Sequence, residues 1–174
     1  MPISNNDRDV MIRTIIGEAA DQSPEGQAAV AHVIMNRSNS PKFGGSPSDV
    51  VFSPGQFEPW STRKTELSGI SMRSRQYQNV GAIVDSVASG QTPDPTGGAT
   101  YFRDPTLMKK RGDTVPNWGK GPGLTIGDHV FYNPDNPNYP NASSPSVKSV
   151  VNAALAAPPD VRSITNAAIG QQTQ

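Results

Sequence analysis

The segment that best predicts the fold reads Ser23-Pro24-Glu25-Gly26-Gln27-Ala28-Ala29-Val30-Ala31-His32-Val33-Ile34-Met35-Asn36-Arg37. Serine is a favourable N-cap and proline suits the first helical position, so we expect a helix that begins at Pro24 and ends near Arg37. Between Ala28 and Met35 this helix is apolar on nearly every face. Such a helix is usually buried at the centre of a small domain.

Further helices are predicted on both sides of this central one. Residues 7–20, capped by Asn5 or Asn6, carry an apolar stripe of Met11, Ile12, Ile15, Ile16 and Ala19. We also expect a short helix over residues 46–53 and a long one over residues 71–89, which Gly90 ends.

The later part of the chain changes character. Residues 99–102 and 125–132 have the β-branched and aromatic composition of short strands, and a Gly- and Pro-rich loop with Trp118 lies between them. This order of elements favours an α+β fold that is mainly helical. We expect one domain over residues 1–132, followed by a Pro/Asn/Ser-rich linker and a short alanine-rich extension over residues 133–174.

Composition excludes several classes of protein. The 174 residues include 15 basic and 15 acidic side chains, two histidines and no cysteine. This balance gives no support to a nucleic-acid or membrane-surface partner, and the lack of cysteine excludes disulfides and thiol chemistry. No signal peptide is visible at Met1, so a protein acting outside the cytoplasm would need another route of delivery, unless the chain is a shortened one.

Glu18 is the first candidate for a catalytic residue. It follows Met11 and Ile15 at helical spacing, so its carboxyl group emerges at the edge of the apolar stripe. Partial burial there raises the pKa of a carboxyl group, which a general acid working near neutral pH requires. We expect the neighbouring Gly17 to leave room for a bulky substrate. The alternative is a surface glutamate that flanks the stripe.

Metal and serine chemistry find little support. His32 and His129 lie far apart, and neither belongs to a His-Glu-x-x-His motif, so we expect no metal and no cofactor. We interpret His32 as a hydrogen-bonded helix residue, whereas His129 would line a cleft or cap a strand edge. No Gly-x-Ser-x-Gly motif occurs.

The segment Gly55-Gln56-Phe57-Glu58-Pro59-Trp60 concentrates an amide, two aromatic rings and a carboxylate in a predicted loop. Amides and flat aromatic faces suit sugars, which offer hydroxyl groups at the rim and C–H bonds on the ring faces. Alternatively, Phe57 and Trp60 fill the core. The basic clusters at residues 63–64, 73–75 and 109–111 are expected to be solvated surface, although an anionic polymer could use them.

Taken together, these pieces resemble the cell-wall hydrolase family of spore cortex-lytic enzymes. The resemblance runs from about Arg13 to Tyr132 and rests on ordered motifs: Ile16-Gly17-Glu18-Ala19, Glu25 to Arg37, Pro54-Gly55-Gln56-Phe57, Gly98-Ala99-Thr100-Tyr101-Phe102, Trp118, and Ile126-Gly127-Asp128-His129-Val130-Phe131-Tyr132.

The resemblance implies a lysozyme-like single domain that cuts the glycan strands of peptidoglycan. Glu18 matches the catalytic glutamate. The substrate-binding residues it suggests are Gln56, Phe57, Thr100, Tyr101, Trp118 and His129. We expect a monomer that acts on the cell wall, and a domain without a visible leader also suits a phage lysin or a virion component.

Two mechanisms remain open for a glycan-cleaving enzyme. Ordinary glycosidases use two carboxylates, for which Asp21, Glu25, Asp49, Glu58 and Glu66 are the possible partners of Glu18. None of these stands in a second motif, so our hypothesis is a lytic transglycosylase with one carboxylate; the alternative is a hydrolytic muramidase. A zinc amidase or peptidase, and a non-catalytic wall-binding or phage-tail protein, are alternatives of other classes.

Overall fold

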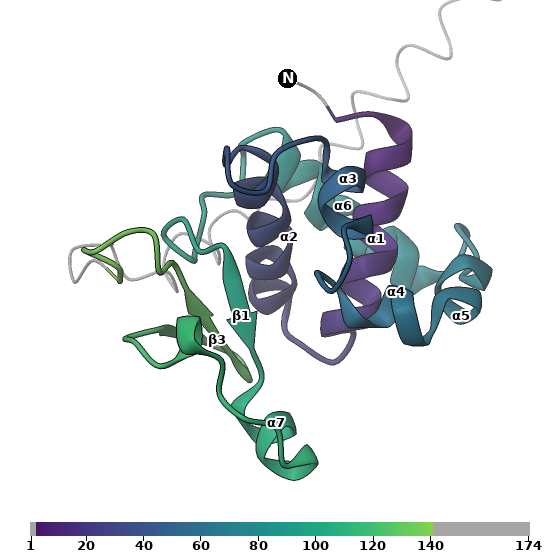
Figure 1. Cartoon of the computed structure of the whole chain (residues 1–174). Coiled ribbons are helices and arrows are strands. Elements are labelled where there is room, and N and C mark those ends of the chain that lie inside the picture. Colours follow the sequence, from purple (N-terminus) through teal and green to yellow (C-terminus); the bar gives the residue numbers. More distant parts are fainter. Residues whose placement is uncertain (1–2, 141–174) are drawn as a thin grey trace, which may run out of the picture.

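The computed structural model describes residues 3–140 and shows helices packed beside a small antiparallel sheet (Figure 1). The helices are α1 (Asn5–Ala19), α2 (Pro24–Ser38), α3 (Pro47–Phe52), α4 (Glu58–Thr62), α5 (Lys64–Gly69), α6 (Arg75–Ala88) and α7 (Pro105–Arg111). The strands are β1 (Tyr101–Arg103), β2 (Leu124–Ile126) and β3 (His129–Tyr132), and a 3₁₀ turn, η1, covers Asn117–Gly119. This confirms the expected α+β class with mainly helical content.

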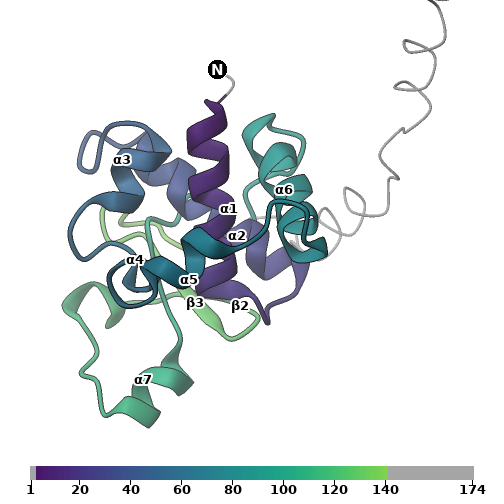
Figure 2. The same ribbon diagram turned by 90° about the vertical axis from the view of Figure 1, so that its right-hand side faces the viewer.

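Helix α2 is the buried centre of the domain, as its sequence predicts. Ser23 caps it by accepting a hydrogen bond from the Gly26 amide, and Pro24 occupies its first turn. Val30, Val33 and Ile34 are fully buried. Helices α1, α3 and α6 surround α2, and the sheet packs on its remaining side (Figures 1 and 2).

Helix α1 begins earlier than its pattern indicates. Ser4, rather than Asn5 or Asn6, is the N-cap. Its hydroxyl accepts a hydrogen bond from the backbone amide of Asp7, and the Asp7 side chain accepts one from the backbone amide of Ser4. Burial alone would raise the pKa of Asp7, but hydrogen bonds from Ser4 and Ser48 outweigh it and lower that pKa to about 2. The charged form of Asp7 therefore ties the start of α1 to α3.

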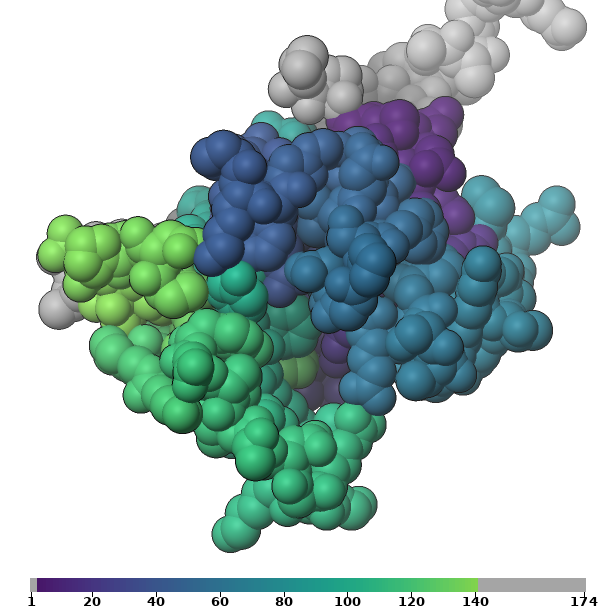
Figure 3. All heavy atoms as spheres, in the orientation of Figure 1, coloured from purple at the N-terminus to yellow at the C-terminus, as the bar shows by residue number. Residues whose placement is uncertain are grey.

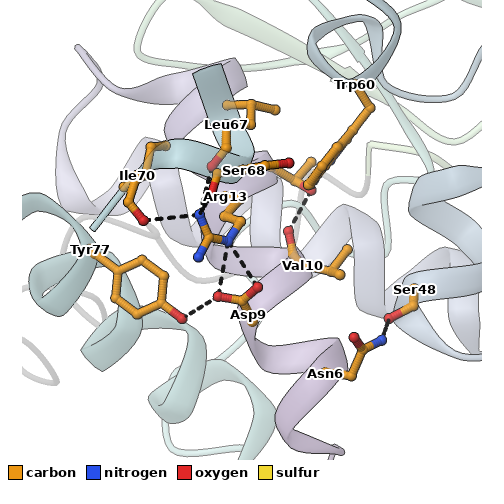
Figure 4. Close-up of polar contacts among 11 residues, drawn as sticks. Asn6, Asp9, Val10, Arg13, Ser48, Trp60, Leu67, Ser68, Ile70 and Tyr77 are labelled. Carbon is orange, nitrogen blue, oxygen red and sulfur yellow. Dashed lines mark hydrogen bonds and ion pairs between the residues drawn. The ribbon is translucent and has the colours of Figure 1, made fainter. Parts of the chain in front are cut away.

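A polar cluster fixes α1 against its neighbours (Figure 4). The buried Arg13 pairs with Asp9, and its Nη1 donates to the backbone carbonyls of Leu67, Ser68 and Ile70 at 2.6, 3.2 and 3.0 Å. Tyr77 of α6 donates to Asp9 at 2.6 Å. A buried charge is tolerated only where it is paired and hydrogen-bonded, so this cluster holds α1, α5 and α6 in one arrangement.

Three predictions about elements are corrected. The long helix starts at Arg75 rather than Ser71, because Ser74 caps it. The segment predicted as one strand over residues 125–132 is a hairpin whose turn contains Gly127, with a left-handed φ of 59°. The order in the sheet is β1-β3-β2. The short elements α4, α7 and η1 begin in segments that we expected to be loops, and no element was predicted where α5 forms.

Residues 133–140, within the predicted linker, lie against the domain. Asn133 donates to the Gly98 carbonyl at 2.7 Å, Asp135 pairs with Lys42 at 2.9 Å, and Tyr139 is buried. The rest of the predicted linker and the alanine-rich extension fall outside the described residues. In the described part of the chain no helix is long and apolar enough to cross a bilayer.

Candidate active site

A groove of about 1130 Å³ runs between the helices and the sheet. One wall comes from the end of α1 and from α4, the other from β1 and α7, and His129 of β3 contributes to the lining. In the space-filling view a hollow opens between the blue segment that contains α4 and the green segment that contains α7 (Figure 3). Its volume exceeds that of most small-molecule pockets, so it suits an extended ligand.

Glu18 lines this groove from the last turn of α1. Its side chain is half-buried, and within residues 3–140 its carboxyl group has no hydrogen-bond or ion-pair partner. Burial, and next the negative charge of Glu58, raise the pKa of Glu18 to about 7; the nearby Arg37 and Arg63 act in the opposite direction. Near neutral pH this carboxyl group can therefore both donate and accept a proton.

Gly17 lines the groove, but the space where its side chain would lie is filled by protein rather than left for a ligand. A Cβ atom at Gly17 would lie 2.8 Å from the Cβ atom of Pro59 and 3.3 Å from Leu67 Cδ2, so α4 and α5 occupy that room. Arg63 also donates to the Gly17 carbonyl at 2.6 Å. The glycine therefore allows close packing of α4 and α5 against α1, which brings Glu58 and Arg63 to Glu18.

Two other carboxylates of those weighed as partners line the groove, Asp21 and Glu58. Glu25, Asp49 and Glu66 are not among the lining residues. Glu58 forms an ion pair of 2.9 Å with Arg111 of α7, and both side chains are about half-exposed. This pair joins α4 to α7 across the groove, and α7 has no buried residue of its own.

Four of the six predicted binding residues line the groove: Gln56, Tyr101, Trp118 and His129. The other two do not. Phe57 is 4% exposed and belongs to the core, and Thr100 is 7% exposed and borders a separate hollow of about 310 Å³. Both lie next in sequence to groove residues, Gln56 and Tyr101.

The aromatic rings in the groove wall form a stacked pair. Tyr101 and Trp118 lie 4.8 Å apart between ring centroids with 25° between their planes, and Tyr132 meets Trp118 edge-on. Stacking holds Trp118 in place although η1 is short. A fixed aromatic face of this kind suits the C–H side of a sugar ring.

The two histidines have different surroundings. His32 is buried and its Nε2 lies 3.1 Å from the Thr92 carbonyl, which confirms its interpretation as a hydrogen-bonded helix residue. His129 is buried in the groove wall, where burial lowers its pKa, so the ring is neutral at pH 7. Within residues 3–140, no three His, Asp or Glu side chains gather as metal ligands would.

Arg37 is a groove residue that sequence reasoning missed. It is 5% exposed, yet it lines the groove and acts electrostatically on Glu18. The available signal was a charged residue at the end of an otherwise apolar helix. We interpreted it only as the point where the helix ends.

A half-buried acid at the end of the first helix, facing a groove between helices and a small antiparallel sheet, is the arrangement of lysozyme-like domains. The sequence matches the cell wall hydrolase family over residues 21–132, more than half of the chain, and the chain belongs to this family. Glu18 lies before the matched range, so the argument for Glu18 as a candidate catalytic residue rests on the geometry of the groove.

Solved structures and curated relatives agree with this family. The catalytic domain of the Bacillus cereus SleB protein has a TM-score of 0.61 and 28% identity, covering 75% of this chain and 92% of that chain. The catalytic domain of a germination-specific lytic transglycosylase, SleB of Bacillus anthracis, has a TM-score of 0.60 and 28% identity, covering 75% of this chain and 96% of that chain.

Two curated relatives are named spore cortex-lytic enzymes. The one from Halalkalibacterium halodurans is 35% identical over 75% of this chain and 36% of its own length, and the one from Bacillus subtilis is 32% identical over 74% and 38%. The chain thus spans less than half the length of these curated relatives.

Proposed function

We propose that the protein cleaves the glycan strands of peptidoglycan between N-acetylmuramic acid and N-acetylglucosamine, as a lytic transglycosylase with Glu18 as acid and base. The observation that carries this proposal is the position of Glu18: a carboxyl group with a pKa of about 7 that lines a groove large enough for a glycan chain. The names of the matched relatives support the choice of substrate.

In the first step, protonated Glu18 donates its proton to the oxygen that links the two sugars. The bond between this oxygen and the anomeric carbon of N-acetylmuramic acid breaks, and the bonding electrons leave with the oxygen. The substrate's own acetamido group shields the positive charge that develops on the anomeric carbon. Burial favours the protonated form of Glu18 that this step consumes.

In the second step, the Glu18 carboxylate accepts a proton from the C6 hydroxyl of the same muramic acid residue. The C6 oxygen then bonds to the anomeric carbon and closes a 1,6-anhydro ring. Glu18 is protonated again, so the cycle consumes no water and needs one carboxyl group.

A hydrolytic muramidase is the second candidate, because Asp21 and Glu58 share the groove with Glu18. Mass spectrometry of purified sacculi digested with the full chain separates the two reactions. Products that end mainly in 1,6-anhydromuramic acid support the transglycosylase. Reducing ends that incorporate ¹⁸O from labelled water would instead identify the muramidase.

The same digest tests the other classes of protein. Loss of activity with a chelator, and its return with zinc, would overturn the proposal in favour of a metal-dependent amidase or peptidase. Binding to sacculi without release of any glycan fragment would identify a non-catalytic wall-binding protein.

A further inference from the structure

The guanidinium group of Arg37 is held, largely buried, in the wall of the groove. Its Nε donates to the Thr100 carbonyl at 2.7 Å, and three aromatic rings surround it, with its Cζ 5.2 Å from the centroid of Phe43, 5.0 Å from Phe57 and 5.4 Å from Tyr101. Cation–π contacts and one hydrogen bond thus fix its position.

One nitrogen of this group lacks a partner. Arg37 Nη1 is buried and has no hydrogen-bond partner among residues 3–140. A buried donor without a partner is destabilising, and more so when it is charged. Burial lowers the pKa of Arg37 to about 10, so the group still carries its charge at neutral pH. The protein therefore retains a buried cation whose Nη1 donors are unused.

The titratable group that changes its charge during the proposed reaction is Glu18, which lines the same groove as Arg37. Besides Arg37 on α2, the charged groups that act on Glu18 are Glu58 at the start of α4 and Arg63 at its end. Further charged or titratable groups line the same groove from the neighbouring segments: Asp21, Tyr101, Arg103, Asp104, Arg111, Asp113 and His129. Arg37 is the most deeply buried of the cations among them, so solvent screens its charge least.

We propose that Arg37 is a positioning residue for the reaction: its buried guanidinium group stabilises the Glu18 carboxylate that exists between the two proton transfers. This inference rests on the proposed role of Glu18. Arg37 does not touch the reacting atoms. It makes Glu18 a stronger acid in the first step, when the proton leaves for the glycosidic oxygen. Glu18 then accepts a proton from the C6 hydroxyl, whereas Arg37 itself neither gains nor loses a proton.

The test compares the pH dependence of glycan cleavage in full-chain variants. In the wild type, we expect the rate to fall as pH rises through about 7. Arg37→Met removes the charge but keeps a long side chain. We expect it to move this fall to higher pH by about 1 unit and to lower the maximal rate about tenfold.

Three further variants serve as controls. Arg37→Lys keeps the charge, so its cleavage rate should fall at nearly the same pH as that of the wild type. Glu58→Gln removes the like charge and should move the fall to lower pH. Arg73→Met changes an exposed arginine outside the groove and should alter nothing. A folded Arg37→Met protein whose rate falls at the wild-type pH would overturn the inference, because a purely structural role does not shift a titration.

A second measurement does not need the Arg37 variant to fold. In the wild type, the ¹⁵N resonances of the Arg37 guanidinium group should titrate with a midpoint near pH 7, and this titration should vanish in Glu18→Gln. Arginine resonances that ignore pH between 5 and 9 would contradict the inference. Full cleavage activity in Glu18→Gln would instead contradict the proposed function, so the two failures can be told apart.

Discussion

Glu18 makes the fold less stable at neutral and alkaline pH. Its pKa is 4.5 in an ordinary environment and about 7 in the folded chain, so the folded protein holds this proton more tightly than the unfolded one. The contribution of Glu18 to the free energy of unfolding is fully present below pH 4.5 and is lost as the pH rises through about 7. The loss amounts to at most about 3 kcal/mol, at 1.36 kcal/mol per pKa unit.

Glu18→Gln should therefore stabilise the protein in a pH-dependent way. We expect the variant to exceed the wild type by up to about 3 kcal/mol at pH 8 and to match it at pH 4, because glutamine resembles the protonated acid. Urea unfolding at both pH values measures the difference. Glu25→Gln, on α2 outside the groove, is the matched control. An equal difference at both pH values would show that Glu18 titrates normally.

At the residue scale, sequence reasoning found Glu18 but not Arg37, for a physical reason. The surroundings of Glu18 follow partly from its own helix, whose apolar stripe can be recognised in the sequence by its helical spacing. The surroundings of Arg37 come from Phe57, Thr100 and Tyr101, which are distant in the sequence. No local pattern predicts such a site.

Among the elements, the pairing of α1 with α4 sets the geometry around Glu18. The absence of a side chain at Gly17 lets Pro59 approach α1, and Trp60 of the same helix donates to Thr14 at 2.8 Å. Glu58 precedes Pro59 directly, so any displacement of α4 changes the charge that faces Glu18. The packing of α4 against α1 therefore affects the pKa of Glu18.

Gly17→Ala should weaken both stability and activity. The added methyl group overlaps Pro59, which costs about 1–3 kcal/mol, whereas alanine regains up to about 1 kcal/mol of helix propensity. Gly69→Ala is the matched control, since a Cβ atom there meets nothing within 4 Å. Thermal unfolding and cleavage of sacculi measure the outcome. A Gly17→Ala protein as stable and active as Gly69→Ala would refute this role of the α1–α4 contact.

The elements that the sequence predicted share strong local signals. Helices α1, α2 and α6 combine a serine cap with an apolar pattern, and the short α3 has a serine cap followed by proline. All four were predicted; α2 begins at the expected residue, whereas the starts of the other three are shifted. Helices α4, α5 and α7 have five to seven residues, too few for a helical period to show. Helix α7 nevertheless carries local signals that sequence reasoning missed, an Asp104 N-cap and Gly112 at its end.

For the molecule as a whole, the groove lies between the helices and the sheet. Its walls come from segments far apart in the chain, and the Glu58–Arg111 pair joins residues separated by 53 positions. The resemblance to a lysozyme-like family implied a cleft, but only the assembled structure shows which side chains line it.

The volume of the groove, about 1130 Å³, predicts a preference for long substrates. Contacts with sugars away from the scissile bond contribute binding energy that can lower the barrier at that bond. We therefore expect longer glycan strands to be cleaved at least about tenfold faster than the disaccharide that contains the scissile bond alone. Rates on a series of defined glycan lengths measure this, and equal rates on the disaccharide and on long strands would contradict a multi-sugar groove.

The most direct test of the account is the rate at which purified sacculi release soluble glycan fragments with Glu18→Gln in place of the wild type. Glutamine keeps the shape of the side chain and removes the proton that it donates. We predict a loss of about a thousandfold in a variant that remains folded. A folded variant that retains more than about a tenth of the wild-type rate would remove Glu18 from the reaction.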